Sequence, residues 1–533
     1  MKMKPISFPP IIGLACAGLL FVSVGCPPCL RAAGLWQEAR TFAGIHRFST
    51  LFCAQDVRDH LSGEEGLQRA LAWCKETGVT KVYIESFRDG YRAERAAIER
   101  ANQRFQAEGF DVCGCVTPTR IGKRSSGWGG VTSCYTDEAT QTNVQAVFEY
   151  AASLFDEIMI DDFWFSNCLC AECDAARRAR TVTIGERTYP VGGDRWEDYH
   201  CELMVRMSRD RVLGPARRVN PKVRLIIKYP QWYDDFHERG YEVIRETADF
   251  DKIWVGTETR DYRDRNWGGT VQYEGYFIMR WLGGIGGAKC GGGWFDSLGT
   301  TEGTYIEQAR QTILGGARES MLYSYGSLQL DTGPKDIMTL RTNLAGLLAV
   351  AQAVHERQPV GVAAYKPANS HPEDEQRVFD FAGMLGLPLV PCHEFPTNAP
   401  AAFFSVHALK DPQFAAELSD FVQAGKPVLL TDGLARRLGN RLNPRPPNVQ
   451  ILPVKGAPKS LLELPRTKLE AIREPLLRPL KTTFHAPNSV ALYLFRDGGF
   501  VVENFNDAST EVEVNGQALT VEGRGWDCRI SGD

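Results

Sequence analysis

Residues 157–173, EIMIDDFWFSNCLCAEC, are the stretch from which the fold of this chain can be predicted. The apolar run at 158–160 is typical of a short buried strand. Asp161 and Asp162 follow it directly, and two aromatic residues and a C-x-C-x-x-C motif come next. In an α/β barrel, residues just past the C-terminal ends of the strands face the substrate. The stretch therefore predicts carboxylates, ring-stacking surfaces and a metal knuckle at one end of a barrel.

Seven other runs resemble this strand and alternate with amphipathic segments such as 63–77, 140–154 and 304–316. Gly78, Gly109 and Gly316 stand where helices should end, as a left-handed cap requires. Eight strand–helix units predict a (β/α)8 TIM barrel within residues 35–358. The alternative is an open doubly wound sheet, but no GxGxxG follows the first strand. The predicted strands are 43–52, 81–87, 110–116, 157–161, 222–228, 252–255, 291–295 and 320–323.

The sequence changes character after residue 358. Short strands at 360–365, 388–391, 402–406 and 427–431, with helices between them, predict a flavodoxin-like α/β domain over residues 359–440. Residues 441–533 begin with a linker rich in Pro, Asn and Arg. Alternating apolar runs at 490–495, 499–505, 510–514 and 519–522, separated by turn signals, then predict a small antiparallel β domain.

The N-terminus predicts export. Lys2 and Lys4 precede an apolar stretch at 11–24, and cleavage after Gly34 would remove a signal peptide of residues 1–34. Lipid attachment at Cys26 is the alternative. No stretch after residue 34 is predicted to be long and apolar enough to span a membrane. A formal net charge of −4 without a basic tract makes nucleic acid a poor candidate partner, so we expect a periplasmic or extracellular protein.

Six of the 15 cysteines fall between Cys113 and Cys173, which indicates a local purpose. The C-x-C-x-x-C spacing can direct three thiolates to one tetrahedral zinc ion. Cys134 stands just before the helix that leads into the same strand, so it is the preferred fourth ligand, with Cys113 and Cys115 as other candidates. Disulfides or free thiols are the alternative. The predicted zinc ligands are Cys134, Cys168, Cys170 and Cys173.

This order of cysteine, helix, strand, acidic residues and cysteine knuckle resembles the family 42 glycoside hydrolases. The resemblance implies a barrel, a flavodoxin-like trimerisation domain, a small β domain and a structural zinc after the fourth strand. In that family the fourth strand ends in Asn-Glu and the seventh-strand nucleophile is Glu. Here the corresponding residues are Asp161-Asp162 and Asp296, so the chain resembles a distant relative, and β-galactosidase specificity is not implied.

Glycoside hydrolysis uses two carboxyl groups, one protonated and one ionised. Asp162 is the predicted general acid/base, and Asp161 is expected to stay ionised beside it. Asp296 is the predicted nucleophile or base, with Glu258 after the sixth strand as its rival. Each lies at the end of a predicted strand that faces one central pocket.

Aromatic residues crowd the same strand ends and can stack on the apolar faces of sugar rings. Polar residues near several strands could bind hydroxyl groups. The predicted substrate-binding residues are His46, Arg47, Glu85, Arg120, Trp164, Trp232 and Trp294.

The sequence therefore predicts an exported glycoside hydrolase that acts on an oligo- or polysaccharide. No Walker A, GxSxG or HExxH motif occurs, and we expect no organic cofactor. Because Asp replaces both expected Glu residues, a non-catalytic carbohydrate-binding or assembly protein on a degenerate barrel is the alternative. A zinc hydrolase is disfavoured, because a site made only of cysteines is closed.

Overall fold

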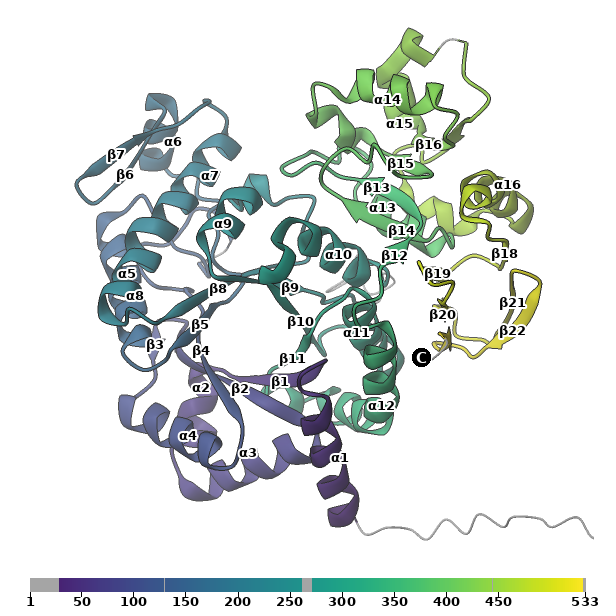
Figure 1. Cartoon of the computed structure of the whole chain (residues 1–533). Coiled ribbons are helices and arrows are strands. Elements are labelled where there is room, and N and C mark those ends of the chain that lie inside the picture. The colour runs from purple at the N-terminus through teal and green to yellow at the C-terminus, as the bar shows by residue number, and fades with distance from the viewer. Residues whose placement is uncertain (1–27, 129, 261–270, 443, 531–533) are drawn as a thin grey trace, which may run out of the picture.

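A computed structural model describes residues 28–128, 130–260, 271–442 and 444–530 of this chain. The chain forms a large α/β barrel, a smaller parallel α/β domain and a C-terminal antiparallel region (Figure 1). Residues 1–27 lie outside the described residues, and with them most of the predicted signal peptide and Cys26. Helix α1 (Pro28–Phe42) spans the predicted cleavage position after Gly34.

Eight parallel strands close the barrel in the order β1-β2-β4-β5-β8-β9-β10-β11, and β11 pairs with β1. Each corresponds to one of the predicted strands, so the predicted (β/α)8 barrel is confirmed. The first strand starts later than predicted, because residues 43–45 form a turn after helix α1. The strands are β1 (Arg47–Phe52), β2 (Val79–Arg88), β4 (Asp111–Val116), β5 (Glu157–Ile160), β8 (Arg224–Tyr229), β9 (Lys252–Gly256), β10 (Cys290–Asp296) and β11 (Glu319–Tyr323).

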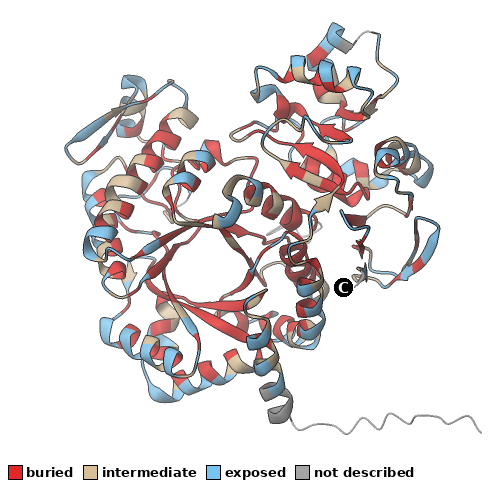
Figure 2. Cartoon of the chain, viewed as in Figure 1, coloured by how far each residue is buried: buried red, intermediate tan, exposed pale blue. Residues whose placement is uncertain are grey.

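Side chains from every strand fill the barrel interior. The strands are buried on both faces, whereas the surrounding helices expose their outer sides to solvent (Figure 2). Cys113 and Cys115 lie in this inner layer beside Met159, so they are not available as zinc ligands. The inner layer contains Leu51, Cys53, Tyr83, Cys113, Cys115, Met159, Ile226, Trp254, Trp294 and Met321.

The helices around the barrel follow the predicted alternation. Gly78, Gly109 and Gly316 have φ values of +69°, +85° and +91°, as predicted for helix ends. The main helices are α3 (Glu64–Glu76), α4 (Arg95–Ala107), α5 (Glu138–Ala152), α7 (Trp196–Met207), α8 (Gly214–Val219), α9 (Val243–Asp249), α10 (Glu274–Gly286), α11 (Glu302–Leu314) and α12 (Gly333–Val354). Shorter additions are α2 (Ala54–Asp56), β3 (Tyr91–Arg92), α6 (Ala171–Ala179), β6 (Thr181–Ile184) and β7 (Arg187–Pro190).

Helix α12 differs from the sequence prediction in one respect. By length and composition it is apolar enough to cross a membrane, although no such stretch was predicted after the leader. Leu340, Leu344 and Leu348 on this helix are fully buried in the protein core. Packing of these leucines into the core also accounts for the apolar composition of the helix.

The second domain has a five-stranded parallel sheet in the order β14-β13-β15-β16-β17. This is the 2-1-3-4-5 order of flavodoxin-like folds. Its last strand, β17, was not predicted and falls within the residues assigned to the linker and C-terminal domain; because it pairs with β16, the second domain extends one strand past the predicted boundary at 440. The elements are β13 (Val362–Tyr365), α13 (Val378–Met384), β14 (Leu389–Cys392), β15 (Ala402–Phe404), α14 (Phe414–Gln423), β16 (Val428–Thr431), α15 (Asp432–Leu438) and β17 (Val449–Leu452).

Two small antiparallel sheets form the C-terminal region. Strand β12 (Pro359–Val360), which connects the barrel to the second domain, pairs with β19 and so belongs to a sheet of this region. The predicted strand 360–365 is therefore divided between two sheets. The remaining elements are α16 (Arg466–Leu477), β18 (Phe484–His485), β19 (Val490–Phe495), β20 (Phe500–Asn504), β21 (Thr510–Val514), β22 (Gln517–Val521) and β23 (Trp526–Arg529).

Candidate active site

A cavity of about 530 Å³ opens at the C-terminal ends of the barrel strands. Six strands contribute to it, either with their last residues or with the residues that follow them. All four predicted catalytic carboxylates line the cavity. Its lining comprises Arg88, Trp128, Asp161, Asp162, Phe163, Lys228, Gln231, Trp232, Glu258, Arg260, Trp294, Asp296, Leu298, Tyr323 and Arg377.

Asp161 is held as an ionised group. Arg88 donates to its Oδ2 at 2.6 Å, Thr117 donates to the same oxygen at 2.9 Å, and the backbone N–H of Asp162 donates to Oδ1 at 2.7 Å. Burial alone would raise the pKa of Asp161, but the charges of Arg88 and Lys228 outweigh it and lower the pKa. Asp161 thus keeps its negative charge next to Asp162.

Lys228 bridges two of the carboxylates from the end of β8. Its ammonium Nζ lies 2.6 Å from Oδ2 of Asp162 and 2.7 Å from Oε1 of Glu258, and it lies 4.2 Å from the ring centre of Trp294. The two carboxylate oxygens are therefore within about 5 Å of each other. Sequence reasoning missed this residue. A lysine near the end of the apolar run LIIKY was the available signal, because a buried lysine needs a charged partner.

Asp296, at the end of β10, belongs to a second charged group. The Arg260 guanidinium pairs with its Oδ2, and the N–H of Leu298 donates to Oδ1 at 3.0 Å. Gln231 joins this pair to Glu258: its amide nitrogen donates to Glu258 Oε2 at 2.8 Å, and its amide oxygen accepts from Arg260 at 3.0 Å. A continuous polar chain therefore runs from Asp162 to Asp296 across the cavity.

The cluster has more carboxyl groups than cations. Among the described residues, Glu85, Asp161, Asp162, Glu258 and Asp296 share three cations, Arg88, Lys228 and Arg260. Burying an unbalanced negative charge is costly, so some of these carboxyls retain protons.

Three carboxyls in the cluster, Glu85, Asp162 and Asp296, have raised pKa values, and burial is the largest cause for each. Burial and the nearby charges of Asp161 and Glu258 raise the pKa of Asp162 to about 8, even though Lys228 lowers it. Burial and the Glu258 carboxylate raise the pKa of Asp296 to about 6 against the attraction of Arg260. Near neutral pH one cavity therefore contains a protonated Asp162 and an ionised Asp296, which are the two forms that acid–base or nucleophilic catalysis requires.

The aromatic residues divide into cavity walls and core. Trp232 and Trp294 line the cavity as predicted, and Phe163 joins them. Trp164 does not, because its side chain is fully buried and its Nε1 donates to Ser208 Oγ at 2.8 Å. Trp164 packs against Tyr135 and Phe148 in the same core layer as Ile158 and Ile160, on the side of the strand away from the cavity.

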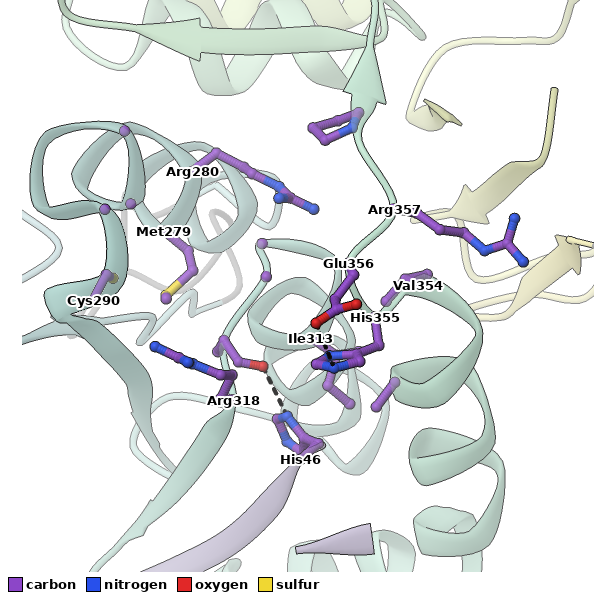
Figure 3. A pocket seen from close by; sticks show the side chains of 18 of the residues that line it. His46, Met279, Arg280, Cys290, Ile313, Arg318, Val354, His355, Glu356 and Arg357 are labelled. Atoms are coloured by element: carbon purple, nitrogen blue, oxygen red, sulfur yellow. Dashed lines mark hydrogen bonds and ion pairs between the residues drawn. The ribbon is translucent and has the colours of Figure 1, made fainter. Parts of the chain in front are cut away.

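Four predicted polar contacts lie elsewhere. His46 and Arg47 are at the N-terminal end of β1, and His46 lines a different cavity of about 550 Å³ together with Arg318 and Glu356 (Figure 3). Arg47 pairs with Asp111 at the start of β4. They were misplaced because residues that open a strand face the opposite end of a barrel.

Glu85 and Arg120 also lie outside the cavity lining. Glu85 is fully buried behind the cavity, where it accepts from Arg88 and from the N–H of Ala54, each at 2.8 Å. It therefore supports Arg88 rather than contacting a ligand. Arg120 is largely exposed and lies 3.9 Å from Asp89.

The predicted cysteine knuckle forms one compact group. The sulfurs of Cys134, Cys168, Cys170 and Cys173 all lie within 4.8 Å of one another. Cys134 Sγ is 3.7 Å from Cys170 Sγ and 3.5 Å from Cys173 Sγ, which is too far for disulfides. Tetrahedral zinc with bonds of about 2.3 Å would separate its sulfurs by nearly the same distance. The geometry and the thiolate chemistry of these four residues fit a structural zinc.

The second domain reaches the cavity through one residue. Arg377, at the N-terminus of α13, lines it and pairs with Glu274 of the barrel at 2.8 Å. Its backbone N–H donates to Asp234 at 2.8 Å. Nothing in the sequence of residues 359–440 had indicated a contribution to the site.

Comparison with known proteins assigns a class to this barrel. Residues 37–346, more than half of the chain, match the family "Probable glycosyl hydrolase, catalytic domain". The chain belongs to this family. A curated relative, an uncharacterized protein of Saccharolobus solfataricus, is 29% identical over 348 residues, which are 61% of this chain and 57% of that protein. The match thus spans little more than half the length of that relative.

Solved structures share the fold. Gan42B, a GH42 beta-galactosidase, is 10% identical, with a TM-score of 0.60 over 90% of this chain and 97% of that chain. A catalytic mutant of Gan42B from G. stearothermophilus gives a TM-score of 0.59 over the same shares. Alpha-L-fucosidase isoenzyme 2 from Paenibacillus thiaminolyticus, also 10% identical, gives 0.50 over 72% and 64%. The resemblance to family 42 is thereby confirmed as a distant relationship in fold.

Proposed function

We propose that this protein hydrolyses O-glycosidic bonds of an oligo- or polysaccharide with the carboxyl pair Asp162 and Asp296. The observation that carries the proposal is the buried, carboxyl-rich cluster in an aromatic-walled cavity, in which the pKa of Asp162 is raised to about 8. A general acid has to hold a proton near neutral pH, and burial beside other carboxylates provides it.

In the proposed reaction Asp162 donates its proton to the glycosidic oxygen as the bond to the anomeric carbon breaks. Asp296, ionised above pH 6, attacks that carbon or activates water, and Arg260 keeps it oriented. Asp161 remains ionised and Lys228 holds the position of Asp162. Glu258 is the rival for the role of Asp296, because the ammonium group of Lys228 contacts both Glu258 and Asp162 and so holds the two carboxyls close together.

A panel of aryl glycosides and neutral polysaccharides tests this function. We expect turnover of at least one substrate, with kcat/KM falling below pH 6 and above pH 8, because Asp296 loses its charge at low pH and Asp162 loses its proton at high pH. Binding without turnover across the panel would instead favour the carbohydrate-binding alternative, which the replacement of Glu by Asp suggests.

We further propose that the cysteine knuckle holds one structural zinc. The four ligands would close the coordination shell, so the ion would supply stability and no reaction step. Purified protein should then contain about one zinc per chain by elemental analysis. Cys170→Ser should release it and lower the melting temperature more than it lowers turnover of the folded fraction. Protein without zinc and with disulfides among these cysteines would contradict the proposal.

Export through the N-terminal leader and assembly as a trimer remain proposals that rest on the leader pattern and on the resemblance to family 42. Light scattering at micromolar concentration tests the trimer, and a monomer would contradict it. Mass spectrometry of the protein recovered from cell fractions tests cleavage after Gly34 against lipid attachment at Cys26.

A further inference from the structure

A second cavity of about 530 Å³ lies beside the catalytic cavity, and Trp128 lines both. Trp128 is in the loop between β4 and α5, and 40% of it is exposed. Its ring meets the ring of Trp232 edge to face at 5.1 Å. A path along the protein surface therefore leads from the catalytic carboxyls past these two rings into the second cavity.

The knuckle loop and helix α7 form the walls of the second cavity. Leu169, between two of the knuckle cysteines, is 56% exposed there, and Trp196 and His200 face it from α7. Exposed apolar side chains that gather in one cavity next to a catalytic site indicate a binding surface.

Hydrogen bonds fix these walls to one another. Ser126 Oγ accepts from the N–H of Leu169 at 2.7 Å, which joins the loop of Trp128 to the knuckle. A ring nitrogen of His200 lies 3.2 Å from the carbonyl oxygen of Cys168, which joins the knuckle to α7. The cysteine knuckle thus lies behind the second cavity and determines the position of its walls.

The chemistry of the lining selects the kind of ligand. Aromatic rings together with Asn167, Glu197 and Glu238 suit the apolar faces and hydroxyl groups of a sugar. Two of these side chains are carboxylates, and the described lining includes no lysine or arginine. Arg195 pairs with Glu197 at 2.6 Å, and the carboxylate and amide oxygens of the lining offer hydrogen-bond acceptors that suit the hydroxyl groups of an uncharged sugar.

We propose that the second cavity is a distal subsite for an uncharged sugar unit, so that the protein binds a neutral glycan chain across Trp128. This inference rests on the proposed function for its orientation relative to the cleaved bond. It predicts that affinity rises with chain length until the second cavity is filled. It also gives the knuckle a role in specificity, because the knuckle holds the wall that carries Leu169.

Binding of oligosaccharides to the Asp162→Asn protein tests the proposal without turnover. Calorimetry would compare dimers with hexamers of β-1,4-galactose, cellulose, xylan and mannan fragments, and oligogalacturonate as the acidic probe. For one neutral series we expect the hexamer to bind about tenfold tighter than the dimer, a difference of about 1.4 kcal/mol. Trp196→Ala and Leu169→Ala should each reduce this difference, whereas Met338→Ala, which removes an equally exposed side chain from α12, should not.

Equal affinity for dimers and hexamers in every neutral series, or tighter binding of oligogalacturonate, would overturn the proposal. Unchanged length dependence in both Trp196→Ala and Leu169→Ala would also overturn it, provided that circular dichroism shows both variants to be folded. Turnover of aryl glycosides is the separate readout of the proposed function. Turnover of aryl glycosides with no dependence of oligosaccharide affinity on chain length would contradict only the distal subsite. Affinity that rises with chain length, without turnover of any glycoside, would contradict only the proposed catalytic function.

Discussion

The two ends of this barrel each contain a buried cluster of charges, and they differ in charge balance. At the N-terminal end, Glu157 accepts from Lys81 at 3.0 Å and from Lys252 at 2.6 Å. Burial alone would raise the pKa of Glu157, but these two lysines lower it to about 2. At the C-terminal end, five carboxyls of the described residues share three cations, and the pKa of Asp162 is raised to about 8.

The comparison shows that burial by itself does not identify a catalytic carboxyl. Both Glu157 and Asp162 are 8% exposed and both contact a lysine. The difference is that three cations, Lys81, Lys252 and Arg224, pair with Glu157 in a cluster that also contains Glu319, whereas Asp162 shares Lys228 with Glu258 and has Asp161 beside it. Where carboxyl groups outnumber cations, some carboxyls have raised pKa values and remain protonated near neutral pH. Where cations match the carboxyl groups, the carboxyls are ionised and their ion pairs hold the fold together.

The largest expected effect comes from replacing Asp162, the carboxyl that is protonated near neutral pH. Asp162→Asn should lower the turnover of an unactivated glycoside by roughly two to four orders of magnitude, the usual range for a general acid. The loss should be much smaller for a dinitrophenyl glycoside, whose leaving group needs no proton. Steady-state kinetics on both substrates measures the contrast. Equal losses on the two substrates would mean that Asp162 does not act as the acid.

The corresponding substitution at the N-terminal end of the barrel, Glu157→Gln, should affect stability instead of catalytic rate. Glu157→Gln should reduce the free energy of unfolding by about 2–3 kcal/mol at pH 7, because it removes a carboxylate whose pKa is lowered by ion pairs. A lowered pKa stabilises the fold above the unfolded pKa and loses this effect as the pH falls toward 2. Denaturant titrations at pH 7 and pH 3 measure it: the difference between wild type and variant should shrink at pH 3, with kcat nearly unchanged at pH 7.

The smallest effect is expected for Arg47→Gln, also at the N-terminal end. Arg47 pairs with Asp111, which is largely exposed, and such surface pairs contribute little. Both kcat/KM and the melting temperature should stay close to wild type. A large loss of activity would show that the N-terminal end takes part in substrate binding after all.

Much of the fold could be predicted because its signals are local. Apolar runs defined the eight strands, and the spacing of Cys168, Cys170 and Cys173 with Cys134 predicted their assembly. Partners that depend on the closed barrel could not be predicted. Lys228 and Arg260 come from separate strand ends, and only closure brings them to the carboxylates. Likewise, the sequence did not show which of the adjacent residues Phe163 and Trp164 would face the cavity, and Trp164 lies in the core.

The protonation state of Asp162 is the central claim, and infrared difference spectroscopy between the wild type and Asp162→Asn measures it directly across pH 4 to 10. The account predicts that the wild type has one additional protonated carboxyl at pH 6 to 7, which ionises near pH 8. The N-terminal cluster, compared through Glu157→Gln, should show an ionised carboxylate over the same range. A carboxylate signal from Asp162 already at pH 5 would contradict the account.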